Sequence, residues 1–168
     1  AVTQQVADCQ CVTYTRFVRK DIIQVYGDGT AFQLGKGVVL HESDKDQATI
    51  ITSGIMVDEA LKAYEQLQAE GIAVRVVDMF TWKPLDEELV LKCAKECGKI
   101  ITCEEHSIIG GLGEAVCALV SEKHPVPVRR VGVNDEFGHS GPAAALLEEM
   151  GLCASHIAEV VRETVKGR

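Results

Sequence analysis

Short Val- and Ile-rich runs alternate along this chain with longer segments of helical periodicity, and this pattern constrains the fold most. The apolar runs lie at 37–40, 48–52, 72–77, 99–103 and 126–131. Apolar residues at helical spacing follow each of the last four runs, as at Ala60, Leu61, Tyr64 and Leu67. Near-continuous apolar strands separated by helices are typical of a parallel sheet covered on both faces. We therefore predict an α/β fold, a three-layer α/β/α sandwich with a mixed, mainly parallel sheet.

Glycine, proline and N-capping residues mark the expected ends of the helices. Gly71 and Gly98 follow apolar helical segments and are natural C-terminal stops, and Asp86 is placed to cap a helix that runs to Cys97. Near the end of the chain, Pro142 fits the first position of one helix, and Ser155 fits the N-cap of the next.

The first 33 residues have a different character from the rest. Residues 2–8 resemble the end of a helix, and 11–17 is rich in β-branched and aromatic residues, which predicts a strand. Residues 19–33 lose all periodicity and contain the turn signal Gly27-Asp28-Gly29. We expect a tail with a linker over 1–33 and one complete domain over 34–168.

The net charge of −8 disfavours nucleic acid and acidic membrane surfaces as partners, because both would be repelled. No stretch is apolar and long enough to predict a membrane span. The seven cysteines are odd in number and scattered through apolar segments, unlike a disulfide framework. This distribution favours a reducing, cytoplasmic location.

Two glycine-rich stretches invite comparison with phosphate-binding loops. Gly110-Gly111-Leu112-Gly113 lies between a predicted strand and a predicted helix, but position 116 is Val where the dinucleotide fingerprint needs a third glycine. A tight turn that packs the helix on the sheet is the favoured interpretation, with Gly110, Gly111 and Gly113 in structural roles. The stretch 29–37 lacks both the spacing and the Ser or Thr of a P-loop.

Glu104-Glu105-His106 directly follows a predicted strand, at the edge where open α/β sheets bind ligands. Two carboxylates and an imidazole could act as acid and base or hold a metal. Neighbouring residues of an extended segment point in opposite directions, however, so the three side chains are not expected to converge. Structural or interface hydrogen bonding is therefore the favoured role, with direct chemistry as the alternative.

The remaining candidates are thiols and arginines. Cys93 and Cys97 share one face of a predicted helix but lack further metal ligands, so core packing is favoured. Cys9-x-Cys11 has no partner motif. Arg16 and Arg19 could form an anion clamp, since Arg binds phosphate through a planar fork, or they could be solvated charges.

The order of several short motifs resembles the C-terminal domain of the transketolase family over residues 34–165. The motifs are Phe32 to Gly37, Ala48 to Gly54, Lys83 to Asp86, Glu104 to His106 with Gly110 to Gly113, and Phe137 to Gly141. The wider superfamily includes deoxyxylulose-phosphate synthase and the β-subunit of 2-oxo acid dehydrogenases, and both stay as alternatives. The resemblance implies a dimeric parent enzyme of sugar-phosphate metabolism that transfers a two-carbon ketol unit with thiamine diphosphate and Mg²⁺.

The tail refines this resemblance. Residues 14–19 look like the last strand of the family's pyrimidine-binding domain, and the resemblance implies a sugar-phosphate contact for Arg19. The family's cofactor-binding and cofactor-activating residues belong to domains that precede this one, and Gly27-Asp28-Gly29 has no suitable downstream Asn. We therefore expect this chain alone to bind no thiamine diphosphate and to be inactive.

On this interpretation the chain completes an enzyme together with missing domains or a partner subunit. The faces meant for those partners should be unusually apolar, and the isolated chain should self-associate. The alternative from another class is a free-standing α/β interaction module.

Overall fold

The computed structural model describes residues 2–18 and 22–167, which contain one five-stranded sheet. Its strands are β1 (Val38–His41), β2 (Thr49–Thr52), β3 (Arg75–Asp78), β4 (Ile100–Ser107) and β5 (Val128–Val133). Their spatial order is β1-β3-β2-β4-β5; β1 pairs antiparallel with β3, and every other pair is parallel. The predicted mixed, mainly parallel sheet is confirmed.

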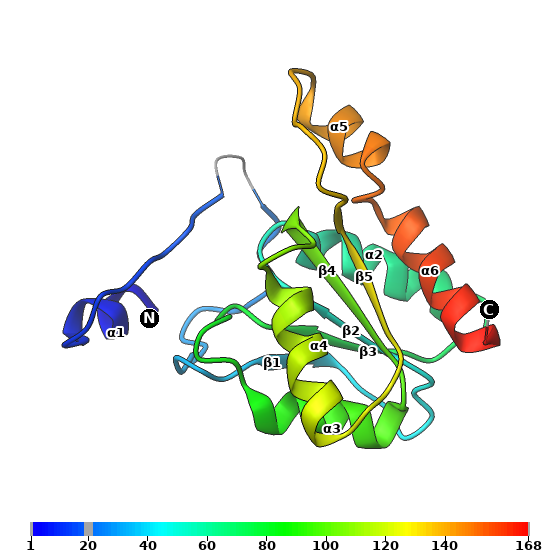
Figure 1. Ribbon diagram of the computed structural model, residues 1–168, viewed down its shortest axis with the longest axis horizontal. Coiled ribbons are helices and arrows are strands. Elements are labelled where there is room, and N and C mark those ends of the chain that lie inside the picture. The colour runs from blue at the N-terminus through cyan, green and yellow to red at the C-terminus, as the bar shows by residue number, and fades with distance from the viewer. Residues whose placement is uncertain (1, 19–21, 168) are drawn as a thin grey trace.

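Two helices cover each face of the sheet, which completes the predicted three layers (Figure 1). One face carries α2 (Met56–Ala69) and α6 (Ala154–Lys166), and the other carries α3 (Glu87–Cys97) and α4 (Leu112–Lys123). Figure 1 shows α1 (Val2–Asp8) and α5 (Ala143–Glu149) projecting from this body, and neither contains a buried residue.

Alternating side chains of the strands build two separate cores. Ile50 and Ile101 are fully buried beneath α2 and α6, whereas Ile51, Val77 and Ile100 are fully buried beneath α3 and α4. Because both faces are covered, each central strand is apolar on both sides, and this is why its sequence reads as a continuous run.

Most predicted helix ends are confirmed. Asp86 caps α3 by accepting a 3.2 Å hydrogen bond from the Leu89 amide, and Gly98 ends the helix in a left-handed conformation with φ of 68°. The prediction for Ser155 was wrong, because α6 begins after Cys153. The Ala154 amide is bonded instead by Glu59 of α2 at 2.8 Å, so a tertiary contact replaces the local cap. Pro142 is the residue immediately before α5 rather than its first residue.

The predicted strand at 11–17 was also wrong, since residues 12–18 are irregular and exposed. β-branched and aromatic residues favour a strand only where a neighbouring strand supplies hydrogen bonds, and the sheet offers none here. The turn at Gly27-Asp28-Gly29 is confirmed, with the Thr30 amide bonded to the Gly27 carbonyl at 3.3 Å.

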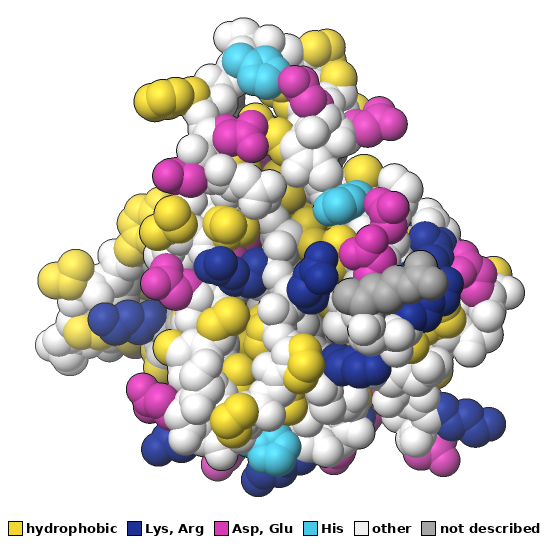
Figure 2. Space-filling model, turned by 45° about the vertical axis from the view of Figure 1, so that its right-hand side comes forward, with side chains coloured by type: hydrophobic (Ala, Val, Ile, Leu, Met, Phe, Trp, Pro, Cys, Tyr) yellow, Lys and Arg dark blue, Asp and Glu magenta, His cyan; other side chains and the backbone are white. Residues whose placement is uncertain are grey.

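Figure 2 shows the face formed around α4, β5 and α6, where Lys and Arg side chains lie among carboxylates rather than in a continuous basic stripe. None of the helices in the described part of the chain combines the length and hydrophobicity that crossing a membrane requires.

Candidate functional site

The carboxyl ends of the four parallel strands gather the polar residues that the sequence singled out. β2, β3 and β4 end at Thr52, Asp78 and Ser107, and Glu104, Glu105 and His106 occupy the last part of β4. A register irregularity between Cys103 and Ser107 separates this part of β4 from regular pairing with β5. This edge is the place where open α/β sheets bind ligands.

Glu104 is fully buried and points at the start of α4. Its Oε2 accepts a 2.7 Å hydrogen bond from the Leu112 amide, and its Oε1 accepts a 2.8 Å bond from the Gly113 amide. Burial raises the pKa of Glu104, and the two amide bonds partly offset that rise. Both carboxylate oxygens are thus used to satisfy the free N–H groups of a helix N-terminus.

Glu105 and His106 do not join Glu104. Glu105 is exposed, and Arg16 bonds to its backbone carbonyl at 3.1 Å and approaches its carboxylate at 3.5 Å. His106 Nδ1 lies 2.8 Å from the Ser107 carbonyl, and its ring meets Trp82 edge-on with centroids 5.7 Å apart. The three neighbours therefore have separate partners, as the alternation of an extended segment dictates.

The glycine turn is shaped by this carboxylate. A Cβ on Gly111 would lie 1.9 Å from Glu104 Oε2, and one on Gly113 would lie 2.7 Å from Thr102 Oγ1. Gly110 adopts φ of 75°, and its amide bonds to the carboxylate of Glu114. The amides that would cradle a phosphate are thus occupied by carboxylates of the same chain.

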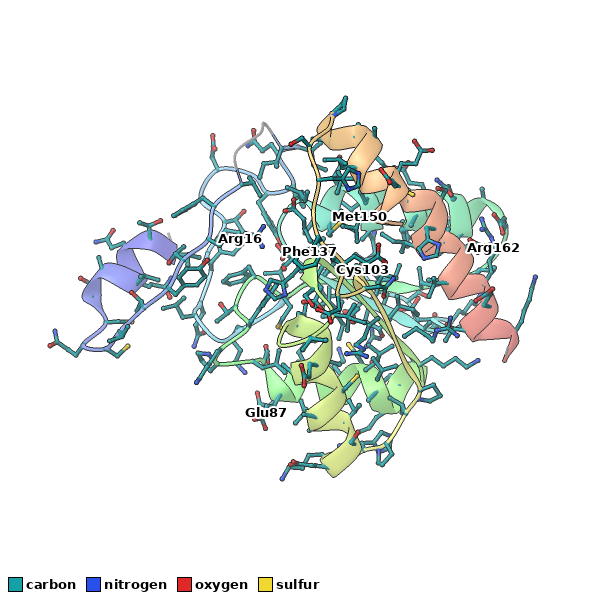
Figure 3. The ribbon with its side chains drawn as sticks, turned by 45° about the horizontal axis from the view of Figure 1, so that its top comes forward. Arg16, Glu87, Cys103, Phe137, Met150 and Arg162 are labelled. Atoms are coloured by element: carbon teal, nitrogen blue, oxygen red, sulfur yellow. The ribbon has the colours of Figure 1, made fainter. Side chains whose placement is uncertain are left out.

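The N-terminal arm, residues 2–18 and 22–36, crosses the carboxyl edge of the sheet. Arg16 reaches from the arm toward the body of the domain (Figure 3), where it meets Glu105. Farther along, the Tyr26 hydroxyl donates a 2.7 Å hydrogen bond to Asp78 Oδ2, and Phe32 packs edge-on between Tyr26 and Phe80. Arg19, the predicted substrate contact, lies outside the described residues.

Asp78 is a buried acid that sequence reasoning missed. It is 6% exposed, its Oδ1 has no partner among the described residues, and burial raises its pKa while the Tyr26 bond lowers it. Burial and the contact with Asp78 also raise the pKa of Tyr26. The available signal was its position, since it ends the apolar run of β3.

A second polar cluster lies at the opposite, amino edge of the sheet. Arg75 is 4% exposed, and its guanidinium lies 2.6 Å from Glu96, 3.6 Å from Asp46 and 3.7 Å from the Cys93 thiol. Cys93 is buried, in agreement with its predicted core role, and burial raises its pKa. Within residues 2–18 and 22–167, no group of three or more His, Cys, Asp or Glu side chains is arranged to hold a metal.

Two surface depressions lie away from Glu104, Glu105 and His106. The smaller, about 190 Å³, is next to Tyr64 and Val74. The larger, about 580 Å³, lies between the end of α5 and the first turns of α6, next to Met150 and Arg162 (Figure 3). Neither depression thus coincides with the carboxyl edge, which the arm contacts at Glu105 and Asp78.

Comparison with known proteins shows which family the chain resembles. Residues 35–157 match the family model described as transketolase, C-terminal domain. A 6-deoxy-6-sulfo-D-fructose transketolase subunit of Clostridium sp. (strain MSTE9) is 41% identical over 153 residues, which cover 91% of this chain and 47% of the relative. A transketolase of Rattus norvegicus is 39% identical over 160 residues, which cover 95% of this chain and 26% of the relative.

The comparison with solved structures also finds a transketolase. A split gene transketolase, described as an inactive beta4 tetramer, matches 99% of this chain and 54% of its own, with a TM-score of 0.93 and 44% identity. The present chain thus spans between about a quarter and about half of the length of the proteins it matches.

Proposed function

Because this chain belongs to the transketolase family and has the fold of its C-terminal domain, we propose that it completes an enzyme that transfers a two-carbon ketol unit between sugar phosphates. The observation that carries this proposal is the match with the split gene transketolase along 99% of the chain. The parent enzyme would depend on thiamine diphosphate and Mg²⁺ and would serve the pentose phosphate pathway in the cytoplasm.

In this proposal the chain does not catalyse by itself. The described carboxyl edge does not fit a thiamine diphosphate site, because Glu104 uses both oxygens to cap α4 and Asp78 accepts the Tyr26 hydroxyl. The glycine turn likewise engages its own carboxylates. When bound elsewhere in the enzyme, the cofactor supplies the carbanion chemistry.

The cofactor-binding residues would come from further domains or from a partner subunit, and the parent enzyme would be a homodimer. Support for a partner subunit comes from the relatives, one of which is named a subunit and another a split gene product. The arm supports it as well. Large side chains with more than a third of their surface exposed cluster there, at Val12, Tyr14, Phe17, Val18, Ile22 and Ile23. Such a surface also favours self-association of the isolated chain, in line with the tetramer described for the split gene protein.

The proposal assigns residues 1–33 to the tail of a pyrimidine-binding domain and 34–168 to the C-terminal domain. Arg19 would contact the sugar phosphate. Glu104, Glu105 and His106 would have structural or interface roles, as would Gly110, Gly111 and Gly113.

Reconstitution tests this function. The chain is mixed with the subunit or domains that complete it, and xylulose 5-phosphate and ribose 5-phosphate are supplied with thiamine diphosphate and Mg²⁺. Ketol transfer is expected from the mixture and from neither component alone. Absence of transfer in a mixture that forms a complex would contradict the transketolase assignment. Stoichiometric binding of thiamine diphosphate to the isolated chain, measured by calorimetry, would contradict the inert-domain proposal.

The bacterial subunit gives a second donor to assay. Its name specifies 6-deoxy-6-sulfo-D-fructose, and it is 41% identical to this chain. Transfer from the sulfonated sugar without transfer from xylulose 5-phosphate would keep the family assignment and change the substrate.

A further inference from the structure

Two cysteines of the arm lie next to one another just beyond α1. The helix ends at Asp8, Cys9 follows it, and the chain bends at Gln10 and Cys11. Cys9 is half-buried and Cys11 is exposed. Neither thiol has a role in the function proposed above.

The local geometry suits a bond between them. In a fully extended chain, Cα atoms two residues apart are separated by about 7 Å, and the bend shortens that separation. A disulfide joins Cα atoms about 4.4–6.8 Å apart. The bend at Gln10 and Cys11 therefore favours closure of the pair.

The other five cysteines are all less exposed than Cys11. Cys93 and Cys103 are buried, whereas Cys97, Cys117 and Cys153 are half-buried. Exposure therefore singles out Cys11 as the first thiol that a reagent in solution meets.

We propose that Cys9 and Cys11 form a dithiol modification site that reacts with small disulfides of the glutathione type. The Cys11 thiolate attacks the small disulfide, a mixed disulfide forms, and one small thiol leaves. The Cys9 thiolate then attacks the sulfur of Cys11, and the second small thiol leaves. Two protein thiols are oxidised to one disulfide, the small disulfide is reduced to two thiols, and the protons of Cys9 and Cys11 end on those thiols.

Oxidation would change how α1 is attached to the domain. The Cys9 thiol donates a 3.3 Å hydrogen bond to the Gln5 carbonyl, and oxidation removes that donor. The Gln5 side chain in turn binds the linker, donating to the Phe32 carbonyl at 2.5 Å and accepting from the Leu34 amide at 3.1 Å. The redox state of the pair is thereby coupled to the contact between α1 and the linker.

Mass spectrometry tests the site directly. The full chain is incubated with oxidised glutathione, denatured, treated with iodoacetamide and digested with trypsin. The first Lys or Arg is Arg16, so the peptide 1–16 contains Cys9, Cys11 and no other cysteine. The expected product is this peptide without glutathione or alkyl groups and lighter than the reduced peptide by two hydrogen atoms.

Several outcomes would overturn the proposal: glutathione that stays attached at Cys11, a disulfide between two chains, or earlier loss of the thiols of Cys97, Cys117 or Cys153. The variant Cys9→Ser should stop at the mixed disulfide, whereas Cys153→Ser should behave as the wild type. Phenylarsine oxide, which bridges neighbouring thiols, gives an independent measurement. One equivalent should bind the wild type at peptide 1–16 and none should bind there in Cys9→Ser or Cys11→Ser; equal binding by all three chains would refute the pairing.

Discussion

The hydroxyl of Tyr26 donates a 2.7 Å hydrogen bond to Oδ2 of Asp78, which joins the N-terminal arm to the carboxyl end of β3. Phe32 packs beside this bond, with its ring centroid 4.8 Å from that of Tyr26 and 5.4 Å from that of Phe80. One polar contact and one aromatic cluster therefore hold the arm over the edge of the sheet.

Replacing Tyr26 by Phe should lower the free energy of unfolding by about 1–3 kcal/mol, because it leaves a buried carboxylate without a donor. Urea denaturation of the purified chain measures this loss. Tyr14→Phe is the matched control, since Tyr14 is 89% exposed, and it should leave the stability unchanged. Equal stabilities of the two variants would contradict a structural role for the Tyr26–Asp78 bond.

The effect of Tyr26→Phe should also depend on pH. Burial raises the pKa of Asp78 above its ordinary value of 3.8, so its contribution to stability is fully present below that value and is lost as pH rises through the folded-state pKa. The Tyr26 bond limits this rise in pKa, so the variant should lose more stability than the wild type as pH rises. The stability difference between wild type and variant should therefore widen from about pH 3 to about pH 7, a range that brackets the ordinary carboxyl pKa. A difference that is constant over this range would show that Asp78 does not titrate in this way.

Gly111→Ala should displace Glu104 from α4, because the added methyl group would lie 1.9 Å from its Oε2. Loss of the two bonds from the Leu112 and Gly113 amides should cost more than about 2 kcal/mol of stability, since hydrogen bonds to charged groups are worth about 1.5–3 kcal/mol each. Chemical denaturation measures the cost, and Gly138→Ala, which has no atom within 4 Å of the new group, serves as control. Combining Gly111→Ala with Glu104→Ala should be less than additive; full additivity would mean that the two residues act separately.

Arg75→Met should destabilise the chain by about 3–5 kcal/mol, because removing one partner of a buried ion pair leaves charge without compensation. Asp46 would suffer most, since its side chain is only 3% exposed. Lys62→Met removes an exposed cation that pairs with Asp58 and Glu59, and it should cost about 0.5 kcal/mol or less. Thermal unfolding of both variants provides the comparison, and a similar loss in both would mean that burial of Arg75 adds nothing.

The sheet and its covering helices could be predicted because their signals are local. The runs at 48–52 and 99–103 are apolar on both sides, and Asp86 and Gly98 mark the ends of α3 within one turn. The strand expected at 11–17 failed for the opposite reason, since a strand exists only with a neighbour that pairs with it, and composition does not reveal the neighbour.

The partners of the polar residues could not be predicted from the local sequence. Alternation along β4 correctly separates Glu104 from Glu105, yet it does not reveal that Glu104 caps a helix that begins eight residues later. The Tyr26–Asp78 bond spans 52 positions, and the Arg75–Cys93 contact connects a strand to a helix. Such contacts follow from the packed topology rather than from any spacing in the sequence.

The outer strand β5 and the arm differ in how well they resist unwanted association. β5 carries the exposed charges of Arg129 and Arg130, which guard a free edge against a foreign strand. Residues 12–18 have the composition of a strand, no pairing partner and no such charge pattern beyond Arg16. Aggregation of the isolated chain should thus begin at the arm. A version that starts at Gln24 would remove these exposed apolar residues while keeping the Tyr26–Asp78 bond.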